Sequence, residues 1–270
     1  MGTSTILTNR DGRVGILTFN RPEALNSFSS TLISDATTAL RELVADDSVL
    51  AIVVNGSGRA FSAGFDLKEG VARNTRGVEA WRKVLEADFE FIIQFWDCPK
   101  PTIAAVHGYC LAGAFEVALA CDITIAGESA LFGEPEVRFG SGIVALLLPW
   151  MTGPKQAKEL LLTGADRLTA RRMLDIGVIN KVVPDGEVLE AALAMAHSIA
   201  AAAPQSVRLT KHAINRTYDL IGLRQSLREA LETDILIEAE ENPERVQFNQ
   251  IRKEQGLAAA LAWRDARQPR

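Results

Sequence analysis

Apolar residues cluster in short runs along the first half of the chain, and these runs predict strands. Runs rich in β-branched residues are typical of strands that are buried in a sheet. They cover 14–19, 49–55, 102–106, 122–126 and 130–133. Between them, apolar residues recur at helical spacing over 29–44, 77–96 and 113–121. Since strands that alternate with helices need crossover connections, the pattern predicts an α/β fold with a mostly parallel sheet.

The second part of the chain, from residue 154 onward, has an almost wholly helical pattern, with one short strand expected near 180–183. The last stretch, 204–263, alternates Leu, Ile and Ala with Arg and Glu at a spacing typical of amphipathic helices. The apolar faces of such helices must be buried, either on the main core or on a partner subunit. We therefore expect an α/β core over residues 1–200 and a helical region over 201–270.

Composition narrows the class of protein. The chain has 270 residues, of which 47% are hydrophobic, so it can bury a sizeable core. Its longest strongly apolar run, 143–150, is far shorter than the roughly 20 residues that span a bilayer. The N-terminus also lacks the basic and apolar segments of a secretory signal. We expect a cytoplasmic protein without a membrane partner.

Charge and cysteine content argue against two further classes. The formal net charge of -5 disfavours a nucleic-acid partner, because phosphate contacts need concentrated Lys and Arg. Cys98, Cys110 and Cys121 show no Cys-x-x-Cys or Cys/His spacing, so neither a disulfide framework nor a metal site is indicated. We expect these three side chains to pack in the core.

Two turns of small residues carry the strongest chemical signal. Each follows a predicted strand: one covers 61–66, and the other, 108–116, leads into a predicted helix. Turns of this kind leave backbone N–H groups unpaired and free to bind an anion. Two such groups directed at one carbonyl oxygen would stabilise an enolate or a tetrahedral oxyanion.

Other nucleotide-binding and catalytic motifs do not fit. The spacing of Gly108 and Gly113 matches a phosphate-binding loop, but Ala114-Phe115 replaces the Lys-Ser/Thr pair that this loop needs. A dinucleotide fingerprint lacks its third glycine, because Phe61 occupies that place. No Gly-x-Ser-x-Gly occurs, so a nucleophile elbow is unsupported.

Four motifs in register resemble the crotonase (enoyl-CoA hydratase/isomerase) superfamily. They are Asn20-Arg21-Pro22 with Asn26, the segment 61–67, His107-Gly108-Tyr109 with Gly113, Glu116 and Cys121-Asp122, and Gly133-Glu134-Pro135-Glu136. The resemblance implies a spiral of ββα units followed by a C-terminal helical trimerisation region over 201–270. It also implies acyl-CoA thioesters as substrates, coenzyme A as part of the substrate rather than a separate cofactor, and a homotrimer or a dimer of trimers.

The resemblance places two oxyanion donors at the backbone N–H groups of Phe65 and Gly113. For Gly113 the physical chemistry agrees, because the first N–H of a helix has no intrahelical partner and the helix dipole favours negative charge there. The same motifs place catalytic carboxylates at Glu116 and Glu136. Glu116 lies in the apolar run 114–121, where a solvated charge is hard to explain and an unpaired buried one is costly.

In hydratases of this superfamily, such a pair of carboxylates holds one water, removes its proton for attack at Cβ and delivers a proton to Cα. Two buried carboxyl groups suit these roles, because burial and like charge can raise the pKa of one toward neutral. One of the two glutamates could instead be a structural ion-pair partner. Glu134 could share a face with Glu136, since residues i and i+2 of an extended segment point the same way.

Motif positions also suggest residues that bind coenzyme A. Ala24 and Leu25 would lie along the pantetheine, Arg59 and Lys68 would lie near the phosphates or adenine, and Ala63 completes the set. Cationic groups fit the charge of the ligand, although each of the two is equally well explained as an ordinary surface residue. No metal ion is implied.

Two further features have simpler explanations in packing. An apolar stripe on 77–96 could line an acyl pocket, but such a stripe is more often plain core. It comprises Trp81, Val84, Leu85, Phe89, Ile92 and Phe95. His107 could serve hydrolase or other acid–base chemistry, but we favour a structural role for it, as for His197 and His212.

With both glutamates present, the resemblance favours an enoyl-CoA hydratase that adds water to a 2-enoyl-CoA. One departure weakens this prediction: hydratases usually continue with a Pro-Gly-rich turn, where this chain has Ile143-Val144. The nearest alternative is an enoyl-CoA isomerase, which can work with a single carboxylate that shuttles a proton. An acyl-CoA hydrolase or lyase comes next. The acidic balance and the two glutamates argue against a non-catalytic protein that binds RNA or another protein.

Overall fold

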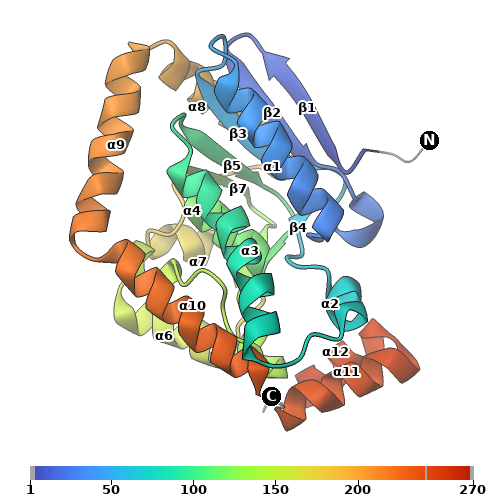
Figure 1. Ribbon diagram of the computed structural model, residues 1–270. Helices are drawn as coiled ribbons and strands as arrows, with labels where there is room; N and C mark the ends of the chain where they lie inside the picture. The colour runs from blue at the N-terminus through green and yellow to red at the C-terminus, as the bar shows by residue number, and fades with distance from the viewer. Residues whose placement is uncertain (1–3, 241, 268–270) are drawn as a thin grey trace.

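A six-stranded sheet lies at the centre of the computed structural model, which describes residues 4–240 and 242–267 (Figure 1). Its strand order is β1-β2-β3-β5-β7-β10. The strands are β1 (Ile6–Asp11), β2 (Val14–Phe19), β3 (Ala51–Gly56), β5 (Thr102–Val106), β7 (Ile123–Gly127) and β10 (Lys181–Val183). β1 pairs antiparallel with β2, and the other neighbours are parallel. The prediction of a mostly parallel α/β sheet is confirmed.

Helices cover both faces of this sheet, which explains the continuous apolar runs of its central strands. Successive residues of a strand point to opposite faces. Val54 therefore packs with α1 (Ser30–Ala45), α3 (Val78–Asp97) and α4 (Gly113–Ala120), whereas Val53 packs against α8 (Val188–Ala200). The edge strand β1 buries only Ile6, so its sequence carries no apolar run and did not predict a strand.

A second, smaller sheet brings together segments that leave the first. Its order is β4-β6-β8-β9, with β4 (Ala60–Ser62), β6 (Tyr109–Leu111), β8 (Leu131–Gly133) and β9 (Leu168–Thr169). β4, β6 and β8 each come directly after a strand of the main sheet. The chain therefore forms one strand in each sheet before the next helix begins. This repetition is the spiral of ββα units that the resemblance implies. Strands of two or three residues are too short to show a period, and of these only β8 was expected.

The predicted helices begin and end within two residues of the observed ones. The Ser29 hydroxyl accepts a hydrogen bond from the Leu32 N–H at 3.2 Å and so caps α1. α3 begins after Gly77, whose φ of 77° suits a residue without a side chain. The remaining helices before residue 200 are α2 (Leu67–Arg73), α5 (Leu148–Met151), α6 (Pro154–Thr163) and α7 (Ala170–Asp175), with 3-10 turns η1 (Pro22–Ala24), η2 (Glu136–Phe139) and η3 (Asp185–Glu187).

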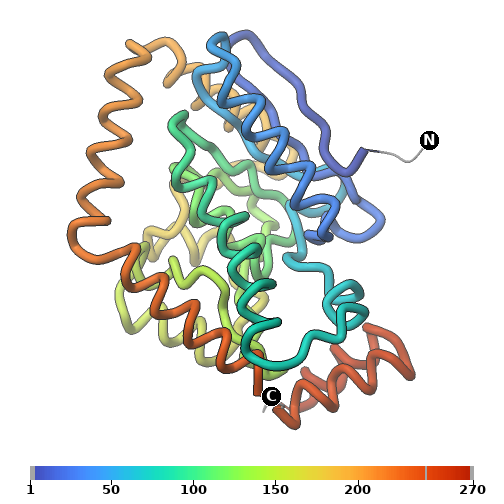
Figure 2. The backbone as a smooth tube through the Cα atoms, viewed as in Figure 1, coloured from blue at the N-terminus to red at the C-terminus, as the bar shows by residue number. Residues whose placement is uncertain are grey.

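The C-terminal part is helical, as the pattern predicts. It consists of α9 (Pro204–Leu220), α10 (Leu223–Ala239), α11 (Pro243–Gln255) and α12 (Leu257–Ala266). α10 runs beside α3, whereas α9 follows the side of the molecule (Figure 2) and buries none of its residues. In the part of the chain that the structure describes, no helix has the length and apolarity of a membrane span.

Candidate active site

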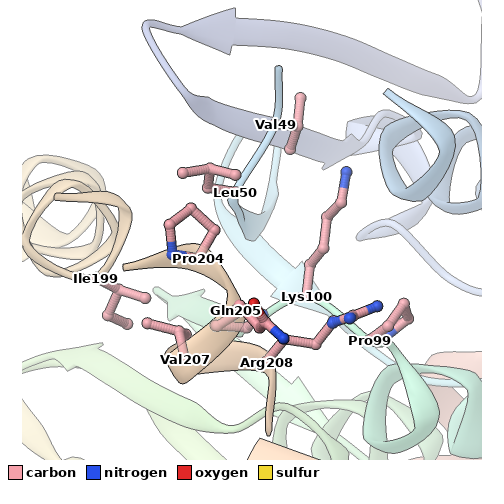
Figure 3. A pocket seen from close by; sticks show the side chains of 10 residues that line it. Val49, Leu50, Pro99, Lys100, Ile199, Pro204, Gln205, Val207 and Arg208 are labelled. Atoms are coloured by element: carbon pink, nitrogen blue, oxygen red, sulfur yellow. The ribbon is translucent and has the colours of Figure 1, made fainter. Parts of the chain in front are cut away.

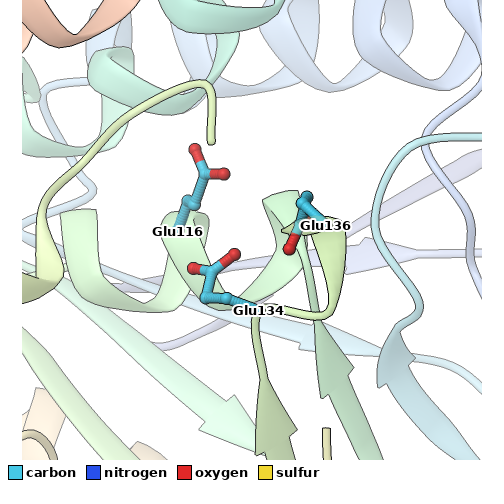
Figure 4. A group of neighbouring side chains, drawn as sticks. All are labelled: Glu116, Glu134 and Glu136. Carbon is cyan, nitrogen blue, oxygen red and sulfur yellow. The ribbon is translucent and has the colours of Figure 1, made fainter. Parts of the chain in front are cut away.

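Three glutamates converge where α4 meets the end of the small sheet (Figure 4). Glu116 lies in the first turn of α4, Glu134 follows β8, and Glu136 begins η2. One carboxylate oxygen of each lies within 4.8 Å of those of the other two. Their exposed fractions are 1%, 2% and 8%. The structure therefore brings the two predicted carboxylates together and adds Glu134 to them.

Burial dominates the electrostatics of this cluster. It raises the pKa of Glu116 and of Glu134 well above the usual range, and the nearby charge of Glu136 raises both further. Burial also raises the pKa of Glu136 to about 8. Two unit charges at such a separation repel by about 3 kcal/mol at an effective dielectric constant of about 20. At neutral pH the three groups therefore cannot all be ionised, so protonated and ionised carboxyl groups coexist in one site.

Hydrogen bonding distinguishes the three carboxyl groups. The Ala145 N–H donates to Glu116 Oε2 at 2.6 Å. Within the described residues, the buried oxygens Glu134 Oε2 and Glu136 Oε2 have no hydrogen-bond partner. Such oxygens can bind a water molecule or, together, a hard cation that prefers oxygen ligands.

The backbone N–H groups of Phe65 and Gly113 have no acceptor within the part of the chain that the structure describes. Around Phe65, the Phe28 N–H donates to the Gly64 carbonyl and the Asp66 N–H donates to the Phe28 carbonyl, which leaves the Phe65 N–H unpaired. Gly113 is the first residue of α4, where no intrahelical acceptor exists. Both predicted oxyanion donors are thus free to bind a ligand.

Close contact between two loops brings these N–H groups together. A Cβ on Gly64 (φ 82°) would lie 3.1 Å from the Gly113 nitrogen and 2.7 Å from the Leu111 oxygen. A Cβ on Gly113 would lie 2.4 Å from the Phe65 ring. The Ala112 N–H donates to the Gly133 carbonyl at 2.8 Å, which ties the same turn to the strand that precedes Glu134. Both glycines are needed because the loops touch at these points.

Comparison with known proteins decides the family. The sequence profile described as enoyl-CoA hydratase/isomerase matches residues 9–246. The chain belongs to the enoyl-CoA hydratase/isomerase family. The resemblance seen in its motifs is therefore confirmed, and the chain is a member of an enzyme family.

Relatives within the enoyl-CoA hydratase/isomerase family match most of the chain. A probable mitochondrial enoyl-CoA hydratase of Dictyostelium discoideum is 39% identical over 229 residues, 83% of this chain and 79% of that protein. The short-chain-enoyl-CoA hydratase of Clostridium acetobutylicum is 36% identical over 222 residues, 80% of this chain and 83% of that protein.

Solved structures of the family share the fold. An enoyl-CoA hydratase/isomerase from Xanthobacter autotrophicus Py2 superposes with a TM-score of 0.97 and 48% identity, covering 100% of both chains. An enoyl-CoA hydratase from Mycobacterium smegmatis superposes with a TM-score of 0.90 and 26% identity, covering 98% of this chain and 94% of that one. The crotonase-like architecture implied by the motifs is thereby confirmed.

The residues predicted to bind coenzyme A form two groups in this family member. The Ala63 N–H donates to the Leu25 carbonyl at 3.0 Å, so Ala63 lies beside the Ala24-Leu25 turn. Arg59 and Lys68 are exposed, and in the described part of the chain their side chains form no ion pair or hydrogen bond. The structure gives no contact between these two cations and the glutamates, so their role stays a prediction.

Buried Asn26 holds the turn of Ala24 and Leu25 in place. Its Nδ2 donates to the carbonyls of Ser57 and Ala60, each at 2.8 Å, and its Oδ1 accepts from the Arg21 N–H at 2.8 Å. The φ angles of Leu25 and Asn26, 51° and 54°, lie in the left-handed region. Three directed hydrogen bonds thus keep this strained turn beside the segment that carries Phe65.

The structure agrees with a packing role for His107, for the three cysteines and for most of the apolar stripe on α3. His107 Nε2 lies 3.0 Å from the Gly58 carbonyl. Cys98, Cys110 and Cys121 are buried and free. Of the apolar stripe on α3, the buried core members are Leu85, Phe89, Ile92 and Phe95.

Sequence reasoning missed Asp234 on α10. Its side chain is 2% exposed, burial raises its pKa to about 8, and its charge raises the pKa of Glu116 and Glu136. Asp234 follows Leu227 and Leu231 at helical spacing and so lies on the buried face of its helix. A carboxylate on the apolar face of an amphipathic helix is the signal that could have found it.

A cavity of 430 Å³ lies at the other end of the main sheet (Figure 3). Its lining residues include Pro99 and Lys100, which precede β5, whereas the unpaired N–H groups and the glutamates follow the carboxyl ends of the strands. The lining also contains Val49, Leu50, Pro101, Ile199, Pro204, Gln205, Val207 and Arg208. This cavity is therefore separate from the candidate active site.

Proposed function

We propose that this member of the enoyl-CoA hydratase/isomerase family is an enoyl-CoA hydratase that adds water across the double bond of a 2-enoyl-CoA. One observation carries the proposal: two unpaired N–H groups lie on touching loops, and one of them, at Gly113, begins the helix that carries Glu116 into a buried cluster with Glu136. The names of the curated relatives support the same reaction.

The two N–H groups would bind the thioester carbonyl oxygen. When water adds at Cβ, negative charge builds up on this oxygen as an enolate, and the Phe65 and Gly113 N–H groups donate to it. The N-terminus of α4 adds the positive end of its dipole at Gly113. Loss of one such donor typically lowers the rate by about 10²–10³.

The glutamates would handle the protons. An ionised carboxylate takes a proton from the water that attacks Cβ, and a protonated carboxyl group gives a proton to Cα, so the proton count balances. Glu116 and Glu136 suit this exchange because burial raises the pKa of both, so that a protonated and an ionised carboxyl group can coexist in the site. Acid–base catalysis of this kind is usually worth about 10²–10⁴ in rate.

The coenzyme A moiety would lie along the turn of Ala24, Leu25 and Ala63, with Arg59 and Lys68 near its phosphates or adenine. The acyl-CoA would thus enter past the segment that Asn26 holds. We further propose a homotrimer or a dimer of trimers, in which the exposed apolar side chains of α9 contact a neighbouring subunit.

A panel of acyl-CoA thioesters analysed by mass spectrometry tests the reaction. Gain of one water by a 2-enoyl-CoA supports the hydratase. Unchanged mass with a shifted double bond would indicate an isomerase, and free CoA would indicate a hydrolase.

Glu136→Gln should abolish water addition while acyl-CoA binding, measured by calorimetry, stays nearly intact. Normal hydration by this variant would refute the role of Glu136.

An enoyl-CoA isomerase is the second candidate, and the hydrogen bond at Glu116 favours it. The Ala145 N–H occupies one oxygen of that carboxylate, and this loop carries Ile143-Val144 in place of the usual Pro-Gly-rich turn. Glu116 would then position the loop, while Glu136 alone shuttles a proton between two carbons of the substrate.

A further inference from the structure

Glu134 is a buried acid to which the proposed mechanism gives no role. It is 2% exposed and follows β8 directly, and its N–H is fixed by the Ala165 carbonyl at 3.1 Å. Its carboxyl oxygen Oε2 has no hydrogen-bond partner within the described residues. An ionised carboxylate in such a position would be costly, so its charge must be neutralised.

Basic side chains do not supply this neutralisation. Across residues 4–240 and 242–267, no Lys, Arg or His forms an ion pair with Glu116, Glu134 or Glu136. The Ala145 N–H supports the ionised form of Glu116, whereas no N–H group of the described residues donates to the Glu134 carboxyl group. A proton in the cluster is therefore best placed on Glu134.

We propose that Glu134 is held as a protonated carboxyl group that donates a hydrogen bond to the Glu136 carboxylate and so orients it. A carboxylate oxygen of Glu134 lies within 4.8 Å of one of Glu136. Hydrogen bonding between the two side chains raises the pKa of Glu134 and lowers that of Glu136. Glu134 keeps its proton through the reaction and acts through Glu136, so it is a positioning residue. The part of this inference that concerns Glu136 as a catalytic group rests on the proposed function, whereas the protonation of Glu134 does not.

The groups that face Glu134 all favour its protonated form. They are Glu116 from α4 and Glu136 from η2, and Asp234 from α10 in turn raises the pKa of Glu116 and Glu136. The Cys110 thiol from β6, whose own pKa is raised by burial and by Glu134, stays neutral beside them. Burial, followed by the charges of Glu136 and Glu116, raises the pKa of Glu134 well above its usual range. Loss of the proton at alkaline pH would remove the donor and add a negative charge beside Glu136.

Infrared spectroscopy tests the protonation without relying on activity. At neutral pH the spectrum of the wild type minus that of Glu134→Gln should contain the C=O stretch of a protonated carboxyl group, displaced by deuteration. Glu128→Gln, at an exposed glutamate just before β8, is the matched control. The spectrum of this variant should contain the same carboxyl band as the wild type. If Glu134→Gln does not fold, the wild-type band, followed as pH rises, gives the same information.

Kinetics test the positioning role. Gln keeps a neutral donor, so Glu134→Gln should retain kcat within about threefold, while Glu134→Leu, which has no donor, should lower kcat at least about tenfold. The alkaline limb of the kcat/KM profile should move to higher pH in Glu134→Gln, because this donor cannot be titrated. A residue that merely fills space would leave the profile unchanged.

Three results would overturn the proposal. One is a difference spectrum without a protonated carboxyl band. Another is an unmoved alkaline limb in Glu134→Gln. The third is a stoichiometric divalent cation, found by elemental analysis of the purified protein, because a cation rather than a proton would then neutralise the cluster. If the thioester panel failed to show hydration while the infrared band was present, the proposed function alone would be refuted.

Discussion

At the scale of single residues, the candidate site consists of groups without ordinary partners. The N–H groups of Phe65 and Gly113 have no hydrogen-bond acceptor among the described residues. Glu134 and Glu136 each have a buried carboxylate oxygen to which no described residue donates a hydrogen bond. Burying such unpaired groups lowers the stability of the folded protein, and favourable packing elsewhere in the structure must offset this loss. Ala112, directly before Gly113, shows this cost in its backbone: its φ of 57° and ψ of -140° are unfavourable for a residue with a side chain.

The conformation of Ala112 leads to a stability prediction. Ala112→Gly relieves the strain, which is worth roughly 1–3 kcal/mol, against a cost of about 0.5–1 kcal/mol for the added freedom of the unfolded chain. We expect a net increase of about 1 kcal/mol in the free energy of unfolding, measured by chemical denaturation. The control Ala114→Gly, within α4, should destabilise the protein. A loss of stability in Ala112→Gly would show that the turn is unstrained.

Protonation of the buried glutamates leads to a pH prediction. Burial raises the pKa of all three glutamates, that of Glu136 from 4.5 to about 8, so the folded cluster holds protons near neutral pH that the unfolded chain has lost. Stability therefore falls as pH rises from about 4.5 to about 8. For a pKa raised from 4.5 to about 8, the loss is on the order of 5 kcal/mol, since one pKa unit corresponds to about 1.4 kcal/mol.

Glu136→Gln removes one titratable group of the cluster, together with the charge that raises the pKa of Glu116 and Glu134. Chemical denaturation at pH 5 and pH 8 should show a smaller fall in the free energy of unfolding for the variant than for the wild type. Glu128→Gln, at an exposed position, is the control and should behave as the wild type. Equal falls for Glu136→Gln and wild type would contradict a buried, proton-binding cluster that includes Glu136.

The predicted residues differ in how the sequence revealed them. Glu116 was expected to be buried because it interrupts the apolar run of α4, and Phe65 and Gly113 were expected from motif positions. Asp234 was missed, because nothing along the chain shows that α10 packs beside α3 and reaches the glutamates. A residue that joins a site through tertiary packing leaves only a weak local signal.

At the scale of elements, the loop between η2 and α5 contacts three other parts of the chain. The Ala145 N–H binds Glu116, Gly140 lies against the Asn242 side chain, and Gly142 lies against Asp234. A Cβ on Gly142 would lie 2.0 Å from Asp234 Oδ1, which leaves no room for a side chain. The position of Ala145 at Glu116 therefore depends on α10.

This packing predicts the effect of one added methyl group. Gly142→Ala should displace the loop and lower kcat at least about tenfold in the thioester assay, because the geometry at Glu116 is lost. Gly186→Ala is the matched control, since a Cβ at Gly186 meets nothing within 4 Å. Full activity in Gly142→Ala would show that the loop has no part in the site.

The sequence predicted the elements of the main sheet better than those of the small one. Central strands such as β3 and β5 are buried on both faces and read as continuous apolar runs. β4, β6 and β9 have two or three residues each, and their existence follows from pairing between distant segments. Periodicity cannot reveal an element that covers little more than one period of two residues.

At the scale of the whole molecule, α9 is a 17-residue helix that the described chain leaves largely uncovered. It buries no residue, and Leu209, Ile214 and Leu220 are 51%, 54% and 70% exposed. A surface of this kind is typical of a contact between subunits. It fits the proposed trimer, in which the helical region over 201–270 joins the subunits.

The proposed assembly predicts the effect of a charge on α9. Leu209→Glu should convert the oligomer to smaller species in sedimentation velocity, because a desolvated charge in an apolar contact is costly. Leu7→Glu, at an exposed position of β1 away from α9 (Figure 1), should sediment as the wild type. A wild-type protein that sediments as a monomer would contradict the assembly.

A crystal structure with an unreactive acyl-CoA thioester bound tests the central claim most directly. The account predicts that the thioester oxygen lies about 2.7–3.1 Å from both the Phe65 and the Gly113 nitrogens, with the acyl chain directed toward Glu116 and Glu136. A thioester oxygen bound elsewhere, or backbone N–H groups that point apart with the ligand in place, would contradict it.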